Sequence, residues 1–273
     1  MVEAVSTAVG IALLASSLWF GHRAVTAGTL YRSVSASGDD SPSTLVDGET
    51  VATEGTVNVV DPPPLSDSLP TDEARSVGAY VWRLTDSENH QYTVAPDGDG
   101  RSDTNRITYA SGIESGTFTV DDGRREIRVD TDWLAETHDS ADITTVSREW
   151  RLSTVLSKRS WASPYLHLDD HQVVHPVADL DDVFDTDAGE TPDGEFFEAS
   201  AVLDGETLAV HGDVTVDRGT PVLRGSDQTP LALSDQGFDA FGASLRRQTL
   251  TYGLAAGGSV ASAGLALANG LVV

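Results

Sequence analysis

The chain ends in an uncharged stretch, QTLTYGLAAGGSVASAGLALANGLVV, which spans Gln248–Val273. A helix needs roughly 20 mostly apolar residues to cross the hydrocarbon core of a bilayer, because no backbone polar group can stay unpaired there. A second apolar stretch of nearly that length opens the chain, from about Ala4 to Gly21. We therefore expect a transmembrane anchor at each end, over residues 1–23 and 248–273, with a water-facing domain over residues 24–247.

A cleaved signal peptide is the alternative interpretation of the opening stretch. A signal peptide begins with a positively charged segment, whereas this chain begins Met1-Val2-Glu3 and has no Lys or Arg before the apolar run. Trp19 and Phe20 close the run, followed by His22, as interfacial residues close a membrane helix. The sequence favours the anchor.

The amino-acid composition limits the environment, the partners and the chemistry expected of the intervening domain. The formal net charge is −26, and Lys158 is the single lysine beside sixteen arginines. An acidic, lysine-poor surface stays soluble where salt screens its self-repulsion, which is typical of halophilic proteins. Nucleic acid is disfavoured as a partner because a negative domain repels phosphates. The chain has no cysteine, so disulfides, thiol nucleophiles and cysteine-ligated zinc are excluded.

The domain between the anchors is predicted to be mainly β. Short alternating or β-branched runs recur between Asp-Gly and Pro-rich turns, and Asp121-Asp122-Gly123 has the pattern of a hairpin turn. Ala95–Asn105 and Asp179–Gly194 are predicted as exposed acidic loops. Near the end, Ser234-Asp235 can cap a helix that continues into the second anchor. The predicted strands are Thr50–Val60, Ala79–Leu84, Gly116–Val120, Glu126–Asp130, Val173–Val177, Leu208–Val216 and Pro221–Leu223.

One short sequence occurs twice. Asp47–Thr50 and Asp204–Thr207 both read Asp-Gly-Glu-Thr, 157 residues apart, and Gly55 and Gly212 follow at matching distances. The spacing is too long for a solenoid repeat. We expect the two strands that follow these turns to lie in one sheet or barrel, which would bring both ends of the domain together at the membrane. A chance match in a chain rich in Asp and Gly is the alternative.

These motifs carry a family resemblance that spans roughly residues 5–270. With an anchor at each end, the chain resembles the GIDE family, which includes mitochondrial and plant membrane-bound E3 ubiquitin ligases. The extramembrane module of that family is called the BAM, or "beside a membrane", domain. The matching motifs are Asp47–Thr50, Gly78–Trp82, Phe118–Gly123, Ile127–Asp130, Phe197–Ala199, Gly205–Leu208 and Ser234–Asp239.

The resemblance implies a membrane-proximal module that engages partner proteins. In eukaryotic members a zinc-bearing RING domain follows the second anchor and recruits the ubiquitin-conjugating enzyme. No RING and no cysteine occur in this sequence, so intrinsic ligase activity is not expected. Ala79 stands where the family often has a cysteine. We predict no catalytic residue, metal or cofactor, and the partner protein cannot be named.

Three histidines are the main candidates for chemistry. His167, His171 and His175 are spaced four apart, which on one helix would place three imidazoles on a metal-binding face. Flanking prolines and Val173-Val174 favour a polar strand edge instead, where residues four apart lie about 13 Å from each other. Asp97–Asp103 resembles a calcium loop but lacks the Gly and Glu that an EF-hand requires. An acidic surface loop is the preferred interpretation there.

Three functions therefore compete. The preferred one is a two-pass membrane protein whose β-rich domain binds partner proteins. The second is an enzyme, either a ligase-family subunit with a separate catalytic partner or a metal-dependent hydrolase that uses the three histidines. The third is a membrane organiser that forms homo-oligomers through small residues of the second anchor, Gly253, Gly257 and Ala261 or Gly258 and Ser262.

The arginines next to the anchors predict the topology. Arg23 and Arg32 follow the first anchor, Arg246-Arg247 precede the second, and the outer ends carry no Lys or Arg. Positively charged flanks stay on the cytoplasmic side. We expect a multi-pass protein of the cell membrane with its body in the cytoplasm and both termini outside.

Overall fold

The structure is a computed structural model that describes residues 2–37, 45–64, 66, 75–87, 106–138, 165–168, 172–176 and 196–271. The chain divides into two compact units. Met1–Gly38 and Phe238–Val273 form the first, called the helix hairpin below, and Asp39–Gly237 form the second, called the β-body.

Each end of the chain forms one long helix. Helix α1 spans Val2–Ser37 and helix α4 spans Gly237–Leu271, and both are long and apolar enough to cross a membrane. Both helices continue past the anchor limits expected at residues 23 and 248. The prediction that a helix beginning near Ser234 continues into the second apolar stretch is confirmed, because α4 has no break.

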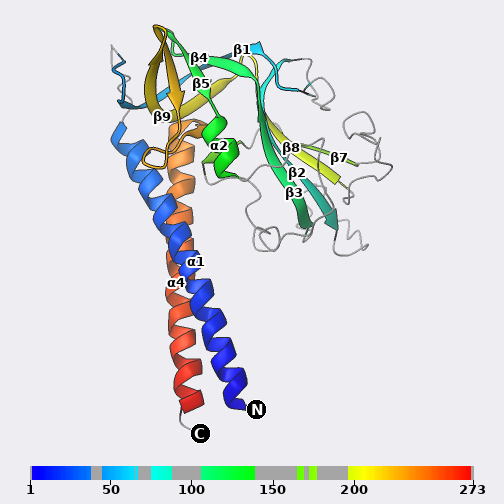
Figure 1. The fold of residues 1–273 in the computed structure, drawn as a ribbon, viewed down its shortest axis with the longest axis vertical. Coiled ribbons are helices and arrows are strands. Elements are labelled where there is room, and N and C mark those ends of the chain that lie inside the picture. The colour runs from blue at the N-terminus through cyan, green and yellow to red at the C-terminus, as the bar shows by residue number, and fades with distance from the viewer. Residues whose placement is uncertain are drawn as a thin grey trace. The chain divides into compact units, whose positions relative to one another are not determined.

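α1 and α4 run side by side and antiparallel, with both chain termini at the same end of the hairpin (Figure 1). The Ser17 hydroxyl donates a hydrogen bond to the Ala256 carbonyl, with an Oγ–O distance of 3.2 Å. At one end of the hairpin, a Cβ added to Gly10 would lie 2.8 Å from Leu267, and at the other end Tyr31 approaches Gly242. The helices are therefore in contact along most of their length.

Small residues lie on two different faces of the hairpin. Gly10 of α1 faces α4, where a Cβ would press against the side chain of Leu267 and force it to shift. In the described part of the chain, by contrast, a Cβ added to Gly253, Gly257 or Gly258 would meet nothing within 4 Å. The glycines of the second anchor therefore lie on an open face of α4 and take no part in closing the hairpin.

The β-body holds two sheets and, among its described residues, one short helix, α2 (Asp132–Thr137). Its strands follow the order along the chain. They are β1 (Thr50–Asp61), β2 (Val77–Ser87), β3 (Arg106–Ser115), β4 (Thr117–Asp121), β5 (Glu126–Asp130), β6 (Leu166–His167), β7 (Gln172–Pro176), β8 (Phe196–Leu203), β9 (Thr207–Asp217), β10 (Thr220–Arg224) and β11 (Ala232–Ser234).

The first sheet closes into a five-stranded barrel. Its order is β1-β4-β5-β10-β9, and β9 pairs back with β1, while β11 and β6 extend the sheet from β9. Every neighbouring pair in the barrel is antiparallel except β5–β10, which is parallel. The OB-fold is a small five-stranded Greek-key barrel of this kind, and because such a fold hosts many functions, the barrel alone identifies none.

The strands that follow the two Asp-Gly-Glu-Thr turns lie in this barrel, as predicted. β1 pairs directly with β9 over Thr50–Thr56 and Thr207–Asp213. The four apolar residues expected to share a core face are all buried in one cluster inside the barrel, namely Val51, Val57, Leu208 and Val214. Alternation of side chains along each strand places them there.

The second sheet has the order β3-β2-β8-β7 and packs apolar residues on both faces. On one face Trp82 stacks on Phe197, with ring centroids 6.2 Å apart and planes 19° from parallel. On the other face Val81 and Ile113 join the core cluster of the barrel. One face of the second sheet therefore shares the hydrophobic core of the barrel, and its other face carries a second cluster. Figure 1 shows the ribbons of both sheets.

All seven predicted strands are present: β5 has the predicted bounds, and the other six have shifted ends. The hairpin turn is also confirmed, because Gly123 has φ +80° and its N–H donates to the Asp121 carboxylate at 2.8 Å. β3, β6, β8, β11 and α2 were not predicted. The two predicted loops, Ala95–Asn105 and Asp179–Gly194, lie outside the described residues.

Candidate functional site

The two Asp-Gly-Glu-Thr copies are related by a local twofold axis. In the β1–β9 pair, Thr53 lies opposite Val210, which is the residue 157 positions further along the chain. Adding 157 to the number of the β1 residue in any other pair gives the β9 residue of the pair that lies at the same distance on the other side of this centre. The sequence repeat therefore corresponds to a symmetric pair of strands.

Each Asp-Gly turn docks on the strand of the other copy. The Gly48 N–H donates to the Val214 carbonyl at 2.8 Å, and the Gly205 N–H donates to the Val57 carbonyl at 2.9 Å. Both glycines have positive φ values, 83° and 78°, which a side chain would strain. The turns thus extend the strand pairing beyond both ends of the β1–β9 ladder.

The aspartates of the turns repeat this symmetry. Asp47 Oδ1 accepts a hydrogen bond from the Val216 N–H at 3.0 Å, and Asp204 Oδ1 accepts one from the Val59 N–H at 2.8 Å. Each carboxylate thereby satisfies a backbone donor of the opposite strand. The two Asp-Gly-Glu-Thr turns, which are among the motifs of the family resemblance, thus stabilise the β1–β9 pairing that closes the barrel.

The glycines of the repeat mark where the backbones approach most closely. A Cβ on Gly55 would lie 2.2 Å from the Asp121 carbonyl oxygen, and one on Gly212 would lie 2.7 Å from the Arg224 carbonyl oxygen. No larger residue fits at either position without moving backbone. These are the points at which β1 and β9 pass from pairing with each other to pairing with β4 and β10.

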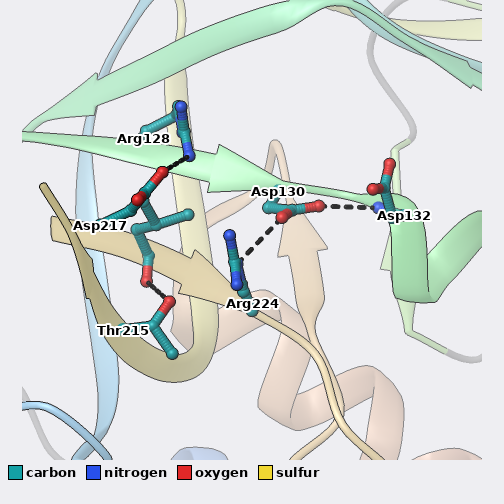
Figure 2. Close-up of polar contacts among 7 residues, drawn as sticks. Arg128, Asp130, Asp132, Thr215, Asp217 and Arg224 are labelled. Carbon is teal, nitrogen blue, oxygen red and sulfur yellow. Dashed lines mark hydrogen bonds and ion pairs between the residues drawn. The ribbon is translucent and has the colours of Figure 1, made fainter. Parts of the chain in front are cut away.

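The outer side of the barrel carries ion pairs that bridge its strands (Figure 2). Arg128 Nη2 lies 3.4 Å from Asp217 Oδ2, and Arg224 Nε lies 3.0 Å from Asp130 Oδ2. Asp130 also accepts the backbone N–H of Asp132 at 3.1 Å. All four paired side chains are 24–49% exposed, so each pair adds about 0–1 kcal/mol to stability.

On the same side of the barrel, Glu126 of β5 bonds to uncharged side chains of β1 and β4. Glu126 Oε1 accepts hydrogen bonds from Thr119 Oγ1 at 2.5 Å and from Asn58 Nδ2 at 2.9 Å. These two hydrogen bonds, that of Thr119 first, lower the pKa of Glu126. We call this surface the outer polar face; it comprises Asn58, Thr119, Glu126, Arg128, Asp130, Asp217 and Arg224. It is a solvated hydrogen-bonding surface, which suits recognition of another macromolecule.

A second polar group is buried between the sheets. Arg83 and Glu198 lie opposite each other on β2 and β8, with Arg83 Nε 2.7 Å from Glu198 Oε2. Thr85 Oγ1 donates to the other carboxylate oxygen at 3.2 Å. The two charged side chains are only 16% and 10% exposed. A buried charged pair is a common mark of an active site, and equally of a structural network.

The neighbours of this pair indicate a structural role. Ser111 lies opposite Arg83 on β3, and its hydroxyl is 3.1 Å from His138 Nε2. His138 caps the C-terminal end of α2. The contact between His138 and Ser111 therefore links the end of α2 to β3. The ion pair between Arg83 and Glu198 links β2 to β8. We call Ser111, Arg83 and Glu198 the inner polar row.

The sequence carried a signal for this row that was not used. Arg83 follows Tyr80-Val81-Trp82 and precedes Leu84, and Glu198 stands between Phe197 and Ala199. A charge enclosed by apolar residues in a strand must find a partner, because burial of an unpaired charge is costly. One such charge of each sign was present.

The three histidines of the predicted cluster do not share one element. His167 ends β6, with Nδ1 3.3 Å from the Ser234 hydroxyl, and His175 lies in β7. β6 belongs to the barrel sheet and β7 to the other sheet, so the single polar strand edge expected here is wrong. His171 lies outside the described residues. Among those residues, no group of three or more His, Cys, Asp or Glu side chains could hold a metal ion.

Another histidine, His211 on β9, was not singled out from the sequence. Its side chain is fully buried, and Nδ1 donates to the Pro230 carbonyl at 3.1 Å. Burial lowers the pKa of His211. The run Leu208-Ala209-Val210 before it was the available signal that this imidazole is a core residue.

Two other residues singled out from the sequence, Ala79 and Ser234, have structural roles. Ala79 is buried in the shared core, where a small apolar residue packs well. Ser234 Oγ accepts the Gln236 N–H at 3.2 Å immediately before α4. The Asp97–Asp103 loop lies outside the described residues.

Comparison of the chain with protein-family models, with curated proteins and with solved structures found no match. The GIDE resemblance therefore stays a prediction that depends on the quoted motifs.

Proposed function

We propose that this chain is a two-pass membrane protein whose acidic β-body binds partner proteins beside the bilayer, as a BAM domain without a RING. The observation that carries the membrane part is the exposure of the hairpin. Only 6% of the apolar window in each helix is buried, whereas the core helix of a soluble protein is mostly buried. Leu18 and Leu254 are 77% and 78% exposed. Such surfaces are stable in lipid and unfavourable in water.

Two features support the binding part. Four motifs of the GIDE resemblance, Asp47–Thr50, Phe118–Gly123, Ile127–Asp130 and Gly205–Leu208, fall on the turns and strands of the barrel. Asp47 and Asp204 each bond to the backbone of the opposite strand there. The outer polar face offers hydrogen-bonding groups and charges of both signs on the strands of the barrel, which suits a polar protein surface. Intrinsic ligase chemistry is not part of the proposal, because the chain has no cysteine.

The binding proposal is tested with the full chain in its own membranes. Resistance to alkaline carbonate extraction comes first, since a protein released by carbonate has no membrane-spanning helix. A photo-crosslinking residue is then placed at Thr117, which is exposed on β4 beside the outer polar face, and a control residue at Thr137, which is exposed at the end of α2 and is not part of that face. We expect capture of one defined set of proteins from Thr117 alone. Equal capture from both positions would contradict the proposal.

The orientation and the acidic surface are proposed on the sequence evidence given above. Protease digestion of right-side-out vesicles should leave the β-body intact if it faces the cytoplasm. The body should also melt at a lower temperature when KCl is reduced from ~1 M to ~0.1 M, because unscreened carboxylates repel each other. A melting temperature that rises at low salt would contradict the halophilic interpretation.

Homo-oligomers of the second anchor are favoured by one specific observation, the open glycine face of α4. Small residues four apart let two membrane helices approach closely. Gly257→Leu should reduce oligomers measured by light scattering in detergent, whereas Gly10→Ala should open the hairpin instead. Oligomers that persist unchanged in Gly257→Leu would exclude this face.

A further inference from the structure

The hairpin and the β-body carry opposite net charge. The hairpin segments 1–38 and 238–273 hold four arginines against Glu3 and Asp239, a net charge of +2. The whole chain has −26, so the body carries −28. The four hairpin arginines are Arg23, Arg32, Arg246 and Arg247.

The hairpin arginines have no carboxylate partner in the described part of the chain, although the chain has 43 acidic residues. Arg246 and Arg247 are exposed. Arg23 lies over the ring of Trp19, with its guanidinium carbon 5.4 Å from the ring centroid. A cation stacked on a tryptophan keeps its hydrogen-bond donors available.

An aromatic group marks a level along the hairpin. The rings of Trp19 and Phe20 lie 5.0 Å apart, and Tyr252 of the other helix stacks on Phe20 at 6.3 Å. We call these three residues the aromatic girdle. Trp and Tyr concentrate where hydrocarbon meets headgroups.

The helix lengths on the apolar side of the girdle match a bilayer. With a rise of about 1.5 Å per residue, the helix from Trp19 back to Val2 is about 26 Å long, and from Tyr252 on to Leu271 about 29 Å. The hydrocarbon core is about 30 Å thick. The girdle therefore fits one boundary of the core, and the other end of the hairpin fits the opposite boundary.

The arginines fall at different heights beyond the girdle, toward the helix ends that join the body. Arg23 is one turn past Trp19, about 6 Å, and Arg246 and Arg247 are about 8 to 9 Å before Tyr252. Arg32 is about 20 Å from Trp19. The headgroup layer is roughly 5 to 8 Å thick on each side. Arg23 and Arg247 thus lie at headgroup height, and Arg246 lies at the outer limit of this layer, which its long side chain can reach. Arg32 lies well beyond the layer.

We propose that Arg23, Arg246 and Arg247 form a belt that binds the phosphate groups of anionic phospholipids. Guanidinium groups bind phosphate through paired, charge-assisted hydrogen bonds. The hairpin that carries the belt has a net charge of +2 in an otherwise strongly acidic protein, and positive charge next to a membrane helix attracts anionic lipid. The inference rests on the proposed membrane function, because the helices must span the bilayer for the girdle to mark its boundary.

The test uses the full chain reconstituted in phosphatidylcholine vesicles that contain a trace of spin-labelled lipid. The immobilised fraction of spin-labelled phosphatidylglycerol is compared with that of spin-labelled phosphatidylcholine. We expect the wild-type protein to prefer phosphatidylglycerol by about threefold or more at ~0.15 M KCl, with a smaller preference at ~1 M. Arg23→Gln, Arg246→Gln and Arg247→Gln combined should abolish the preference.

Arg32→Gln is the matched control, since it removes the same charge from the same helix outside the headgroup layer. It should leave the preference unchanged. Equal immobilisation of the two lipids by the wild-type protein would overturn the belt while leaving the membrane proposal intact. Absence of any immobilised lipid would overturn the membrane proposal itself. A triple variant that keeps its lipid preference but loses thermal stability would show that the arginines pair with carboxylates of this chain instead.

Discussion

The hairpin and the β-body place the same residue types in opposite environments. Leucines of the hairpin such as Leu18 and Leu254 are mostly exposed, whereas Leu208 and Leu223 of the body are buried. Arg83 and Arg128 of the body are paired with carboxylates, whereas in the described residues the hairpin arginines are not. The difference fits the proposal that the hairpin is surrounded by lipid and the body by water.

The largest expected effect breaks the body and spares the hairpin. Leu208→Asp places a charge in the barrel core, where Leu208 is 1% exposed. Burial of an unpaired charge costs several kcal/mol, so the body should unfold. Loss of the near-ultraviolet circular dichroism of the body, with carbonate resistance retained, would verify that the two units are independent.

Val216→Asp is the control, because Val216 lies on the same strand and is 48% exposed. The free energy of unfolding of this variant should lie within about 0.5 kcal/mol of the wild-type value. If Leu208→Asp were equally harmless, the barrel interior would not be the core of the body.

The second effect distinguishes buried from exposed ion pairs. Glu198→Gln leaves Arg83 buried without its carboxylate and should cost about 3 kcal/mol in the free energy of unfolding. Asp217→Asn breaks an exposed pair with Arg128 and should cost less than about 1 kcal/mol. Chemical denaturation of the two variants measures both changes in the free energy of unfolding. Equal changes would contradict the expectation that the buried ion pair matters more than the exposed one.

The third effect is on the pH dependence of the body. Burial lowers the pKa of His211, so between its folded and unfolded pKa values the unfolded chain binds more protons. The contribution of His211 to stability is therefore full above its ordinary pKa of about 6.5. It falls by about 1 kcal/mol per pH unit below that value, until the folded-state pKa is reached.

Melting curves between neutral pH and about pH 5 measure this slope. His211→Asn keeps a side-chain donor for the Pro230 carbonyl and removes the titration, so its curves should depend less on pH. An unchanged slope in His211→Asn would assign the effect to other groups.

The smallest effect concerns a single exposed carboxylate. Thr119→Val removes the first of the two hydrogen bonds that lower the pKa of Glu126. The pKa of Glu126 should rise toward its ordinary value, and carbon-detected NMR of labelled glutamate can follow it. Thr117→Val, on the same strand, should leave that pKa in place.

Strands with strong local patterns could be predicted from the sequence. β5 matches its predicted range, and the Asp-Gly repeat correctly indicated that β1 and β9 share a sheet. β8 was missed because Phe196–Leu203 is rich in alanine and contains glutamate, which are poor strand formers. Its place between β2 and β7 overrides that preference through tertiary packing.

The candidate surfaces were less predictable, because they depend on register between distant strands. Arg128 meets Asp217 only because β5, β10 and β9 are neighbours in the barrel. The histidine spacing misled for the related reason that the chain passes between two sheets after His167. Periodicity describes one strand at a time and cannot supply such pairings.

The pairing of the two ends of the chain has a consequence for its synthesis. β1 pairs with β9, and Gly10 of α1 lies beside Leu267 of α4. Each early element therefore has to wait for a partner that is made much later in the chain. At about 5–20 residues per second, α1 waits roughly 10–40 seconds for the first residues of α4, and one edge of β1 waits roughly 7–30 seconds for β9. Chains released before β9 is complete therefore expose an open strand edge to aggregation, and the two helices can pair only after α4 has been made.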